Sequence, residues 1–590
     1  MWKVLKFFKI LVFALFYFCL TTSISHAGSQ RTPSQILPED FKKPGTIEDL
    51  DSRKQKELFP EKPTISEEQQ EKIEIKILPK TLIILAPEQL QDKINFNIYK
   101  DLIINREINI EDLYRLAKQI TKEFNDNGFP LVRAIIPKQE LKAKEATVFV
   151  KVIDGFIEKI DISNVPKLQR LRTYAYLKPL RNKKALTKEE LERQLILAGN
   201  TAGLTVKSGF VQGKQEGGSI LVLEADHKLL SGSIQFNNTQ SEELGRQLGQ
   251  KSITINSPTG FGESVTFFGL SRPTKPGTMG AGKKAPIRGG GVSLSVPIGN
   301  NGLSSNLSYV ESMTRPGGDI LSLGLEANNK TATATVSYPL VVEPSRTWFL
   351  KGTLNWNDEI QQTSSSGQID HLSHDRVTSL RLGATFNGCK VGCISFDAEI
   401  SRGLDLISRS SSEVGEGTPL SRATATSSYH HMKVNASYSF YPYEDIFFAL
   451  NGGAQYTDDP LLNSEQSTIV GEDKISGLTS GAISGDKTWY LRAQVDKEVR
   501  FTETLSLSPY IYSAMGVAYL NRPTATEEKE TAAKSIGIGI KFQAYDKYFF
   551  DKSITAKAEI TKTWATGFVE EVSDVRLNKE QVLLSLAMTF

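Results

Sequence analysis

The sequence predicts a mainly β protein in which a long C-terminal part made of strands follows two smaller α/β units. From residue 229 to residue 590, apolar and polar residues alternate for roughly ten positions, a turn follows, and the alternation resumes. A period of two indicates strands, because successive side chains of a strand point to opposite faces. Ahead of this part, the order strand, helix, helix, strand, strand occurs twice. The alternation by itself allows a soluble sheet with an apolar core or a membrane barrel with an apolar outside.

The C-terminal part divides into sixteen alternating runs, and the last of them is among the clearest. The runs are 229–240, 246–257, 262–272, 289–298, 303–312, 328–340, 346–358, 374–387, 392–404, 423–441, 444–457, 486–500, 504–520, 533–548, 552–565 and 581–590. A further run, 320–327, would make the count odd. Bacterial single-chain barrels have even counts, so we assign it to a loop excursion or to an extended neighbouring strand. The connections alternate between short turns and long loops, of which 359–373 and 458–485 are two of the long ones.

The start of the chain is typical of an exported protein. Residues 1–27 combine Lys3, Lys6 and Lys9 with an apolar run over 10–20 and small residues before a cleavage site at Ala27, which predicts a secretory signal peptide. A lipoprotein signal at Cys19 is a weaker alternative. No other apolar run has the length of a membrane-spanning helix.

The overall composition points to several domains without a strongly charged partner. A chain of 590 residues exceeds one compact domain, and its formal net charge of +3 gives no reason to expect a nucleic-acid partner. Residues 28–71 are polar and rich in proline and read as a linker. A short helix after Thr46 and a disordered tether are equally consistent with this segment.

The two α/β units are expected at 72–153 and 154–227, ahead of the barrel-like part at 228–590. In the first unit, the strand 73–77 leads into apolar and helical material, and 110–127 has the apolar spacing of a strong amphipathic helix. Strands are expected over 131–136 and 146–152. The second unit repeats the order, with strands at 156–162, 204–211 and 219–225 and helices at 168–177 and 187–198.

Patterns that carry catalysis or ligand binding are weak in this sequence. Cys389 and Cys393 flank a short turn, and in an exported chain this pair predicts a disulfide. The glycine-rich segment 277–283 resembles a phosphate-binding loop but lacks its Ser or Thr, and 370–375 contains two His and two Asp that read as a solvated loop. No Gly-x-Ser-x-Gly motif occurs. We therefore expect no enzyme activity, no cofactor and no metal.

The order of parts resembles a known family. A signal peptide, a linker, two β-α-α-β-β units and a long barrel ending in Phe590 are similar to the two-partner secretion transporters (TpsB) of the haemolysin and filamentous-haemagglutinin types, within the superfamily of POTRA-bearing barrels. The resemblance covers nearly all of the chain after residue 27. It implies two periplasmic POTRA domains, a linker helix that plugs the pore, a sixteen-stranded antiparallel transmembrane barrel in the outer membrane, and Phe590 as the C-terminal barrel signal.

The loop 458–485 is the informative part of this resemblance. Family members carry Val-Arg-Gly-Phe/Tyr in it and Ser-Gly-Asp at its end, and here Ser484, Gly485 and Asp486 match the second motif. The first motif is represented by Ile469, Val470, Gly471 and Glu472, so the family Arg is replaced by Val470.

The family Arg pairs with an Asp on the inner barrel wall, and Ala514 occupies that position here. Loss of both partners together is physically coherent, since loss of one leaves an unpaired charge in a confined lumen. Three interpretations stay open: Glu472, Asp473 or Lys474 holds the loop through wall residues such as Arg492, the motif is misaligned, or the chain is a divergent, inactive member.

The implied function is export of another protein. The alternation places Arg492 and Gln494 on a polar lumen wall that wets an unfolded chain. In the first unit, a client is expected to add a strand to the edge at Leu131, Val132, Arg133, Ala134, Ile135 and Ile136, beside the helix residues Leu116 and Ile120.

The resemblance implies a large secreted exoprotein with an N-terminal secretion domain as the client. It also implies a monomer surrounded by outer-membrane lipid and inserted by the barrel-assembly machinery. An outer-membrane assembly factor and a passive porin remain alternatives.

Overall fold

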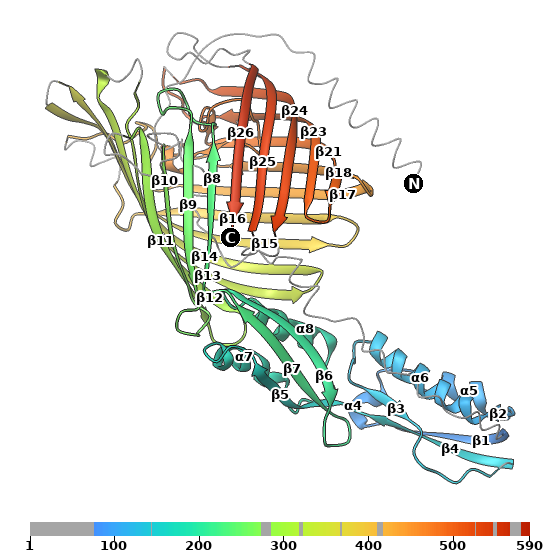
Figure 1. Cartoon of the computed structure of the whole chain (residues 1–590). Coiled ribbons are helices and arrows are strands. Elements are labelled where there is room, and N and C mark those ends of the chain that lie inside the picture. Colours follow the sequence, from blue (N-terminus) through green and yellow to red (C-terminus); the bar gives the residue numbers. More distant parts are fainter. Residues whose placement is uncertain are drawn as a thin grey trace.

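The computed structural model describes residues 76–142, 144–272, 285–317, 322–365, 368–409, 417–525, 527–546, 552–566 and 580–590. In these residues two small α/β units form an arm that leads to a large barrel (Figure 1). The expected signal peptide and linker, and the glycine-rich segment 277–283, lie outside the described residues. Within the described part of the chain, no helix has the length and apolar character needed to cross a membrane.

The first unit is a four-stranded sheet covered by helices. Its elements are β1 (Lys76–Leu85), α4 (Glu88–Gln91), α5 (Asn97–Ile103), β2 (Ile108–Asn109), α6 (Ile110–Asp126), β3 (Arg133–Ile135) and β4 (Lys144–Ile153). The strand order is β2-β1-β4-β3, with β1 parallel to β4, so β3 forms one edge of the sheet. β1 continues through 78–85, where the sequence suggested apolar and helical material. Pro79 lies at an irregularity of the β1–β4 pairing, which accounts for a proline inside this strand.

Helix α6 confirms the amphipathic helix expected from the sequence. Asn109 and Asp112 form a capping box at its start, in which the Asp112 carboxylate accepts a hydrogen bond from the Asn109 N–H. Its buried face, which includes Leu116, Ile120 and Phe124, packs into the core of the first unit. This core holds the helix against the sheet.

The second unit repeats the topology of the first. Its elements are β5 (Phe156–Asn164), α7 (Arg170–Leu177), the 3-10 helix η2 (Lys178–Leu180), α8 (Lys188–Gly199), β6 (Leu204–Gln212) and β7 (Gly218–His227). The order is β5-β7-β6, with β5 parallel to β7. The Thr187 hydroxyl caps α8 by accepting a hydrogen bond from the Glu190 N–H, as its capping-box sequence predicts.

Polar contacts fix the second unit to both of its neighbours. Asp154, which is buried, accepts hydrogen bonds from the Ala185 N–H at 3.0 Å and from the Gln89 side chain at 2.8 Å, and so joins the two units. On the barrel side, the Arg193 guanidinium donates to the carbonyls of Asn301 at 3.1 Å and Pro339 at 2.9 Å. The second unit therefore sits directly beneath turns at one end of the barrel.

The barrel is closed and antiparallel, and it contains the sixteen expected strands, with β21 and β22 forming one interrupted strand. The strands are β8 (Leu230–Asn237), β9 (Leu248–Asn256), β10 (Ser264–Ser271), β11 (Ile287–Ile298), β12 (Leu303–Thr314), β13 (Leu325–Glu343), β14 (Arg346–Ser365), β15 (Gln368–Cys389), β16 (Cys393–Leu404), β17 (His430–Tyr443), β18 (Ile446–Tyr456), β21 (Lys487–Lys497), β22 (Val499–Thr502), β23 (Leu505–Tyr519), β24 (Glu530–Asp546), β25 (Lys552–Ala565) and β26 (Glu580–Thr589). The mainly β fold class predicted from the sequence is confirmed.

Two details of the strand assignment needed the structure. The further run at 320–327, which would have made the strand count odd, ends inside β13, since residues 325–327 belong to that strand. β13 is therefore the extended neighbouring strand expected from an even count. The expected loop 359–373 is wrong, because β14 and β15 remain paired almost to their connection at 366–367. Much of this stretch is polar on both faces, so the alternation fades although the strands continue. Asp370 and Asp375 consequently lie in a strand.

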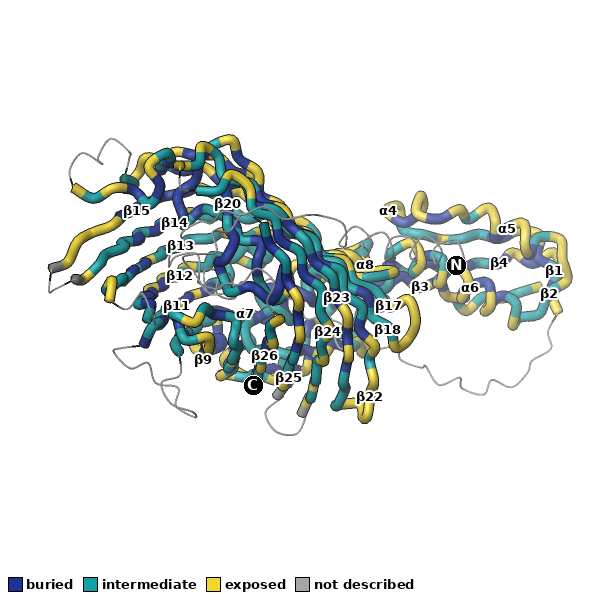
Figure 2. Tube along the Cα trace, turned by 90° about the horizontal axis from the view of Figure 1, so that it is seen from above, coloured by how far each residue is buried: buried dark blue, intermediate teal, exposed yellow. Residues whose placement is uncertain are grey.

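The distribution of exposure decides between a soluble sheet and a membrane barrel. Along the strands, exposed and less exposed residues alternate (Figure 2). Large apolar side chains such as Ile253, Phe267 and Ile560 are more than half exposed on the outside. Their neighbours on the inside are polar, as in the hydrogen-bonded pair Thr254 and Thr266. An apolar outside and a polar inside are typical of a barrel that faces lipid.

The barrel closes by a short pairing between its first and last strands. β26 pairs with β8 over five residues, from Ser585 opposite Asn237 to Thr589 opposite Ser233, whereas β13 and β14 pair over most of their length. Phe590 extends this seam by exchanging backbone hydrogen bonds with Gly232. A Cβ atom at Gly232 would lie 2.8 Å from the Phe590 ring, so this position has room only for glycine.

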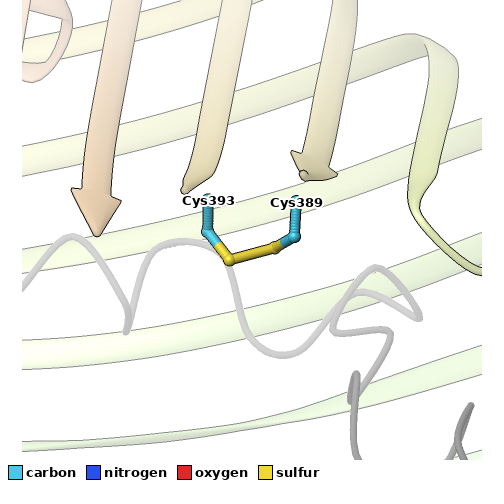
Figure 3. Close-up of a disulfide and its surroundings, with 2 residues drawn as sticks. All are labelled: Cys389 and Cys393. Atoms are coloured by element: carbon cyan, nitrogen blue, oxygen red, sulfur yellow. A yellow bond between two sulfur atoms is a disulfide. The ribbon is translucent and has the colours of Figure 1, made fainter. Parts of the chain in front are cut away.

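The turn between β15 and β16 carries a disulfide. Cys389 and Cys393 lie opposite each other in the strand register and are bonded through their sulfur atoms (Figure 3). The bridge closes one of the turns at the end of the barrel that faces the two α/β units.

Candidate functional site: the lumen hairpin and its anchors

The connection between β18 and β21, residues 457–486, folds back into the barrel. It contains the 3-10 helix η5 (Asn463–Glu465) and a small hairpin of β19 (Ser467–Thr468) and β20 (Ser484–Gly485). We call residues 467–485 the inner hairpin. Its apolar side chains share a buried cluster with Tyr510 and Tyr512 of β23. These tyrosines alternate with Ile511, which is exposed on the outside, so the hairpin lies against the inner wall.

Apolar contacts form one part of the attachment of the inner hairpin. Its contributing side chains are Ile469, Val470, Ile475, Leu478, Ala482 and Ile483. Val470 replaces the expected Arg and lies in the same cluster as Ala514, which replaces the expected Asp. Full burial of a Val, Leu or Ile side chain contributes roughly 1.5–3 kcal/mol, whereas a buried ion pair is often neutral against an apolar replacement. The apolar substitutions therefore keep the hairpin attached.

A polar anchor lies beside this apolar cluster. Arg492 of β21 is almost fully buried and donates to the Ser476 hydroxyl at 3.1 Å, to the Lys474 carbonyl at 3.4 Å and to the Glu559 carboxylate at 3.1 Å. Ser476 also contacts Glu559, which in turn accepts a hydrogen bond from the Tyr510 hydroxyl at 2.8 Å. The ion pair between Arg492 and Glu559 joins two strands of the barrel wall. The hairpin binds this pair through the Ser476 hydroxyl and the Lys474 carbonyl.

The expected lumen-wall residues form one continuous polar row. Arg492 also donates to the Gln494 side-chain carbonyl at 2.9 Å, and the Gln494 amide donates to Asp496 at 2.8 Å. Lys474 reaches back within the hairpin and donates to the Thr468 carbonyl at 3.0 Å. Residues 472–474 were the candidates for holding the loop. Lys474 contacts Arg492, and it does so through its own backbone carbonyl.

Glycine is favoured at three places in the hairpin, at Gly477, at Gly481 with φ +73° and at Gly485, and Gly471 is not one of them. Gly477 has φ +91° and lies so close to the wall that a Cβ would be 2.4 Å from the Thr563 hydroxyl. A Cβ at Gly485 would be 2.8 Å from the Tyr519 carbonyl. At Gly471, by contrast, the nearest atoms are 3.7 Å away and belong to the flexible Lys474 side chain. Glu472 follows at the half-buried tip of the hairpin.

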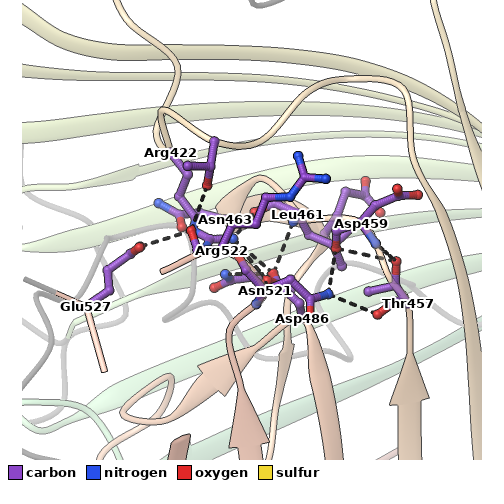
Figure 4. Close-up of polar contacts among 12 residues, drawn as sticks. Arg422, Thr457, Asp459, Leu461, Asn463, Asp486, Asn521, Arg522 and Glu527 are labelled. Atoms are coloured by element: carbon purple, nitrogen blue, oxygen red, sulfur yellow. Dashed lines mark hydrogen bonds and ion pairs between the residues drawn. The ribbon is translucent and has the colours of Figure 1, made fainter. Parts of the chain in front are cut away.

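The residue at the end of the Ser484-Gly485-Asp486 motif is the centre of a buried network. Asp486 has no exposed surface and accepts hydrogen bonds from Arg422 at 3.1 Å and from the backbone N–H groups of Leu461 at 3.1 Å and Asn521 at 2.7 Å (Figure 4). Burial raises the pKa of Asp486, although Arg422 and the donated backbone hydrogen bonds favour its carboxylate form. The desolvation cost of burying this pair offsets much of the attraction between its charges.

In the first unit, the structure alters the expected client-binding edge. The strand there is β3, only three residues long, because Pro137 follows and lacks the N–H that would extend the pairing. Leu131 lies in the preceding turn and packs against the second unit, Val132 is buried, and Arg133 and Ile135 are exposed.

The two helix residues named for this edge do not face a groove. Leu116 is 3% and Ile120 0% exposed, since both point into the core below the sheet. Their assignment as client contacts is therefore corrected. Thr121 is the α6 residue at the edge, and its hydroxyl accepts a hydrogen bond from the Ala134 N–H at 2.8 Å.

Comparisons with known proteins agree with this architecture. The family model described as haemolysin secretion/activation protein ShlB/FhaC/HecB matches residues 217–542, and the model of a POTRA domain of the ShlB type matches residues 88–155. The first match spans more than half of the chain. The chain belongs to the ShlB/FhaC/HecB family. It is an outer-membrane two-partner secretion transporter that secretes an exoprotein, with its POTRA region in the periplasm.

Individual relatives of this transporter are distant. The heme/hemopexin transporter protein HuxB of Haemophilus influenzae (strain 86-028NP) is 21% identical, over 80% of this chain and 83% of its own length. The hemolysin transporter protein ShlB of Serratia marcescens is 22% identical, over 74% and 75%. The solved structure of CdiB from Escherichia coli has a TM-score of 0.63 and 16% identity, and the match covers 94% of this chain and 95% of CdiB. The family is one of secretion pores and not of enzymes.

Replacing Arg492 with methionine is expected to loosen the inner hairpin. The change leaves Glu559 buried without its main partner, and breaking a buried pair costs about 3–5 kcal/mol, which is roughly 10²-fold or more in the opening equilibrium. Hydrogen exchange of 467–485 in the purified protein measures this opening. The double variant R492M/E559Q removes both charges and is expected to restore most of the protection. Equal exchange in the single and double variants contradicts the assignment of this anchor.

Proposed function

We propose that the exoprotein docks on the first unit by adding a strand to β3, passes the second unit and enters the barrel lumen. The observation that carries this proposal is the continuity of the route: the free edge of the first unit, the fixed junction at Asp154, and the second unit seated at the barrel turns through Arg193. The polar lumen wall wets an extended chain, and folding outside the cell gives the transport its direction.

The β3 edge supports strand addition through its backbone. Arg133 and Ile135 pair with β4, so the peptide groups of Val132, Ala134 and Ile136 point away from the sheet. Added strands gain affinity from such main-chain groups with little demand on sequence. The Ala134 N–H is bound to Thr121 and the Val132 N–H donates to the Phe129 carbonyl at 3.3 Å, so an incoming strand must displace these partners or use the Ile136 N–H and the outward carbonyls.

We further propose that the transporter works as a monomer and that the barrel-assembly machinery inserts it, with Phe590 at the end of β26 as the recognised signal. Closure of the barrel within one chain supports the monomer, since the lumen needs no second copy. A passive porin explains the barrel and leaves the two docked units without a role.

A second function, insertion of other barrel proteins into the membrane, is favoured by one observation. The seam between β8 and β26 is short, and a client strand could enter a barrel that opened there. The two functions differ in whether this seam must part.

A disulfide across the seam separates the two functions. Gln235 and Ala587 lie directly opposite at a position without mutual hydrogen bonds, where Cα atoms are about 4.5 Å apart, so Q235C/A587C suits a bridge. If the client passes through the lumen, the oxidised variant is expected to secrete as well as the reduced one and as well as each single variant. Loss of export on oxidation, with recovery on reduction, contradicts passage through a closed lumen and favours the insertion function.

A further inference from the structure

Arg422 joins three separate segments at the outer end of the barrel. It lies between β16 and β17, and its guanidinium donates to the Leu461 carbonyl at 2.9 Å, to the Asp486 carboxylate at 3.1 Å and to the Glu527 carboxylate at 3.0 Å (Figure 4). It also reaches the Asn521 carbonyl at 3.2 Å. Both Arg422 and Asp486 are essentially inaccessible to solvent.

These contacts span part of the mouth of the barrel. Asn521 and Glu527 follow β23, which is three strand positions away from β17 in the order β17-β18-β21-β23. With neighbouring strands about 4.8 Å apart, the Arg422 segment reaches across roughly 15 Å of the rim. The same segment is held at a second point, where the Asn463 N–H donates to the Ser421 hydroxyl at 3.4 Å.

The arrangement holds both ends of the inner hairpin at once. Leu461 precedes the hairpin and Asp486 follows it directly, and Arg422 binds the two together. The side-chain amide of Gln466, the residue just before the hairpin, also donates to Asp486 at 3.2 Å. While these contacts persist, both ends of the hairpin stay fixed at the outer rim of the barrel.

We propose that Arg422 and Asp486 form an outer lock, a pair of positioning residues that holds the inner hairpin in the resting lumen and parts when the client is exported. This inference rests on the transport function and goes beyond it by naming the contact that must break. A buried ion pair gives little net stability but defines one geometry, which suits a contact that opens and recloses. The lock is separate from the Arg492 anchor, which holds the middle of the hairpin from the wall.

The lock is tested first by preventing its release. The backbone N–H of Asn463 lies 3.4 Å from the Ser421 hydroxyl, so Ser421→Cys with Asn463→Cys puts two thiols on adjoining segments. A bridge between them, verified first by mass spectrometry, ties the Arg422 segment to 457–466. Export by the oxidised double variant is expected to fall about tenfold or more and to return on reduction. Wild type and both single variants receive the same treatment, because reduction also opens the Cys389–Cys393 bridge. Unchanged export by the cross-linked protein overturns the proposal.

The lock is tested second by weakening it. Arg422→Met is expected to raise hydrogen exchange over 467–485 and the open probability of the pore in planar bilayers, each by about tenfold. Arg522→Met is the matched control, since this exposed arginine is on the same rim and its side chain lies outside the Asp486 contacts. If R422M folds and behaves like R522M, the proposal fails. If R422M does not fold, the cross-linking result alone decides the proposal. Whether or not R422M folds, export by the reduced S421C/N463C variant shows separately that the transport function is intact.

Discussion

Removal of residues 72–153 is expected to reduce secretion of the exoprotein to the detection limit while the barrel still inserts into the outer membrane. The first unit has a hydrophobic core of its own, whereas the core of the second unit extends to Val342 of the barrel. Loss of the first unit removes the contacts of Leu131 and Gln89 with the second unit, but it leaves in place the core that the second unit shares with the barrel. Immunoblotting of the culture medium measures secretion, and heat-modifiable migration in gels reports the folded barrel. Undiminished secretion by the truncated transporter contradicts docking on the first unit.

A single substitution sharpens this prediction. Ile136→Pro removes an N–H that points away from β4, without touching the Arg133 and Ile135 pairings. Loss of one main-chain hydrogen bond, at about 0.5–1.5 kcal/mol, together with the bulk of the ring, is expected to weaken client binding about tenfold. Ile136→Ala keeps the N–H and is the control. Equal binding of the isolated secretion domain to both variants argues against strand addition at β3.

Val470→Arg is expected to displace the inner hairpin. Val470 is buried in the same apolar cluster as Ala514, so an arginine at 470 has no acidic partner at 514. An unpaired buried charge costs on the order of several kcal/mol, which exceeds the contribution of the lost valine contacts. The expected results are faster hydrogen exchange over 467–485 and a larger, more frequent conductance in planar bilayers.

The double variant V470R/A514D makes this prediction specific. It supplies the acidic partner that the family pairing contains, so it is expected to return exchange and conductance most of the way to wild-type values. Val470→Met serves as a control for size, since it adds volume without charge. If Ala514→Asp does not compensate for Val470→Arg, the two positions do not face each other. The interpretation that Val470 and Ala514 replace the ion pair of the family is then wrong.

Local patterns in the sequence determined most of the fold. Period-two alternation located all sixteen strands, and the capping-box sequence at Thr187 marked a helix start correctly. The pattern failed where its physical cause was absent. β14 and β15 continue through residues that are largely polar on both faces, and β1 continues through a proline that sits at a register irregularity.

The candidate site was less predictable because its contacts join distant parts of the chain. Glu559 is 67 residues from Arg492, and Arg422 is 64 residues from Asp486, so no spacing in the sequence connects them. Alternation places Glu559 on the inner face of β25, which was the one available signal. Leu116 and Ile120 were misassigned for a related reason: the same helical spacing marks a core face and a binding face, and only the position of the sheet tells them apart.

The short seam has a consequence for the order in which the barrel assembles. It joins residues as far apart as Asn238 and Leu584, 346 positions away, whereas every other strand pairs with a near neighbour in sequence. Closing so long a loop has the highest entropic cost of any strand pairing in the barrel, and the pairing of five residues offsets little of that cost. The seam is therefore expected to form last. Until it forms, β8 and β26 are two open edges, each able to pair with another chain, so the unfinished barrel needs protection from aggregation.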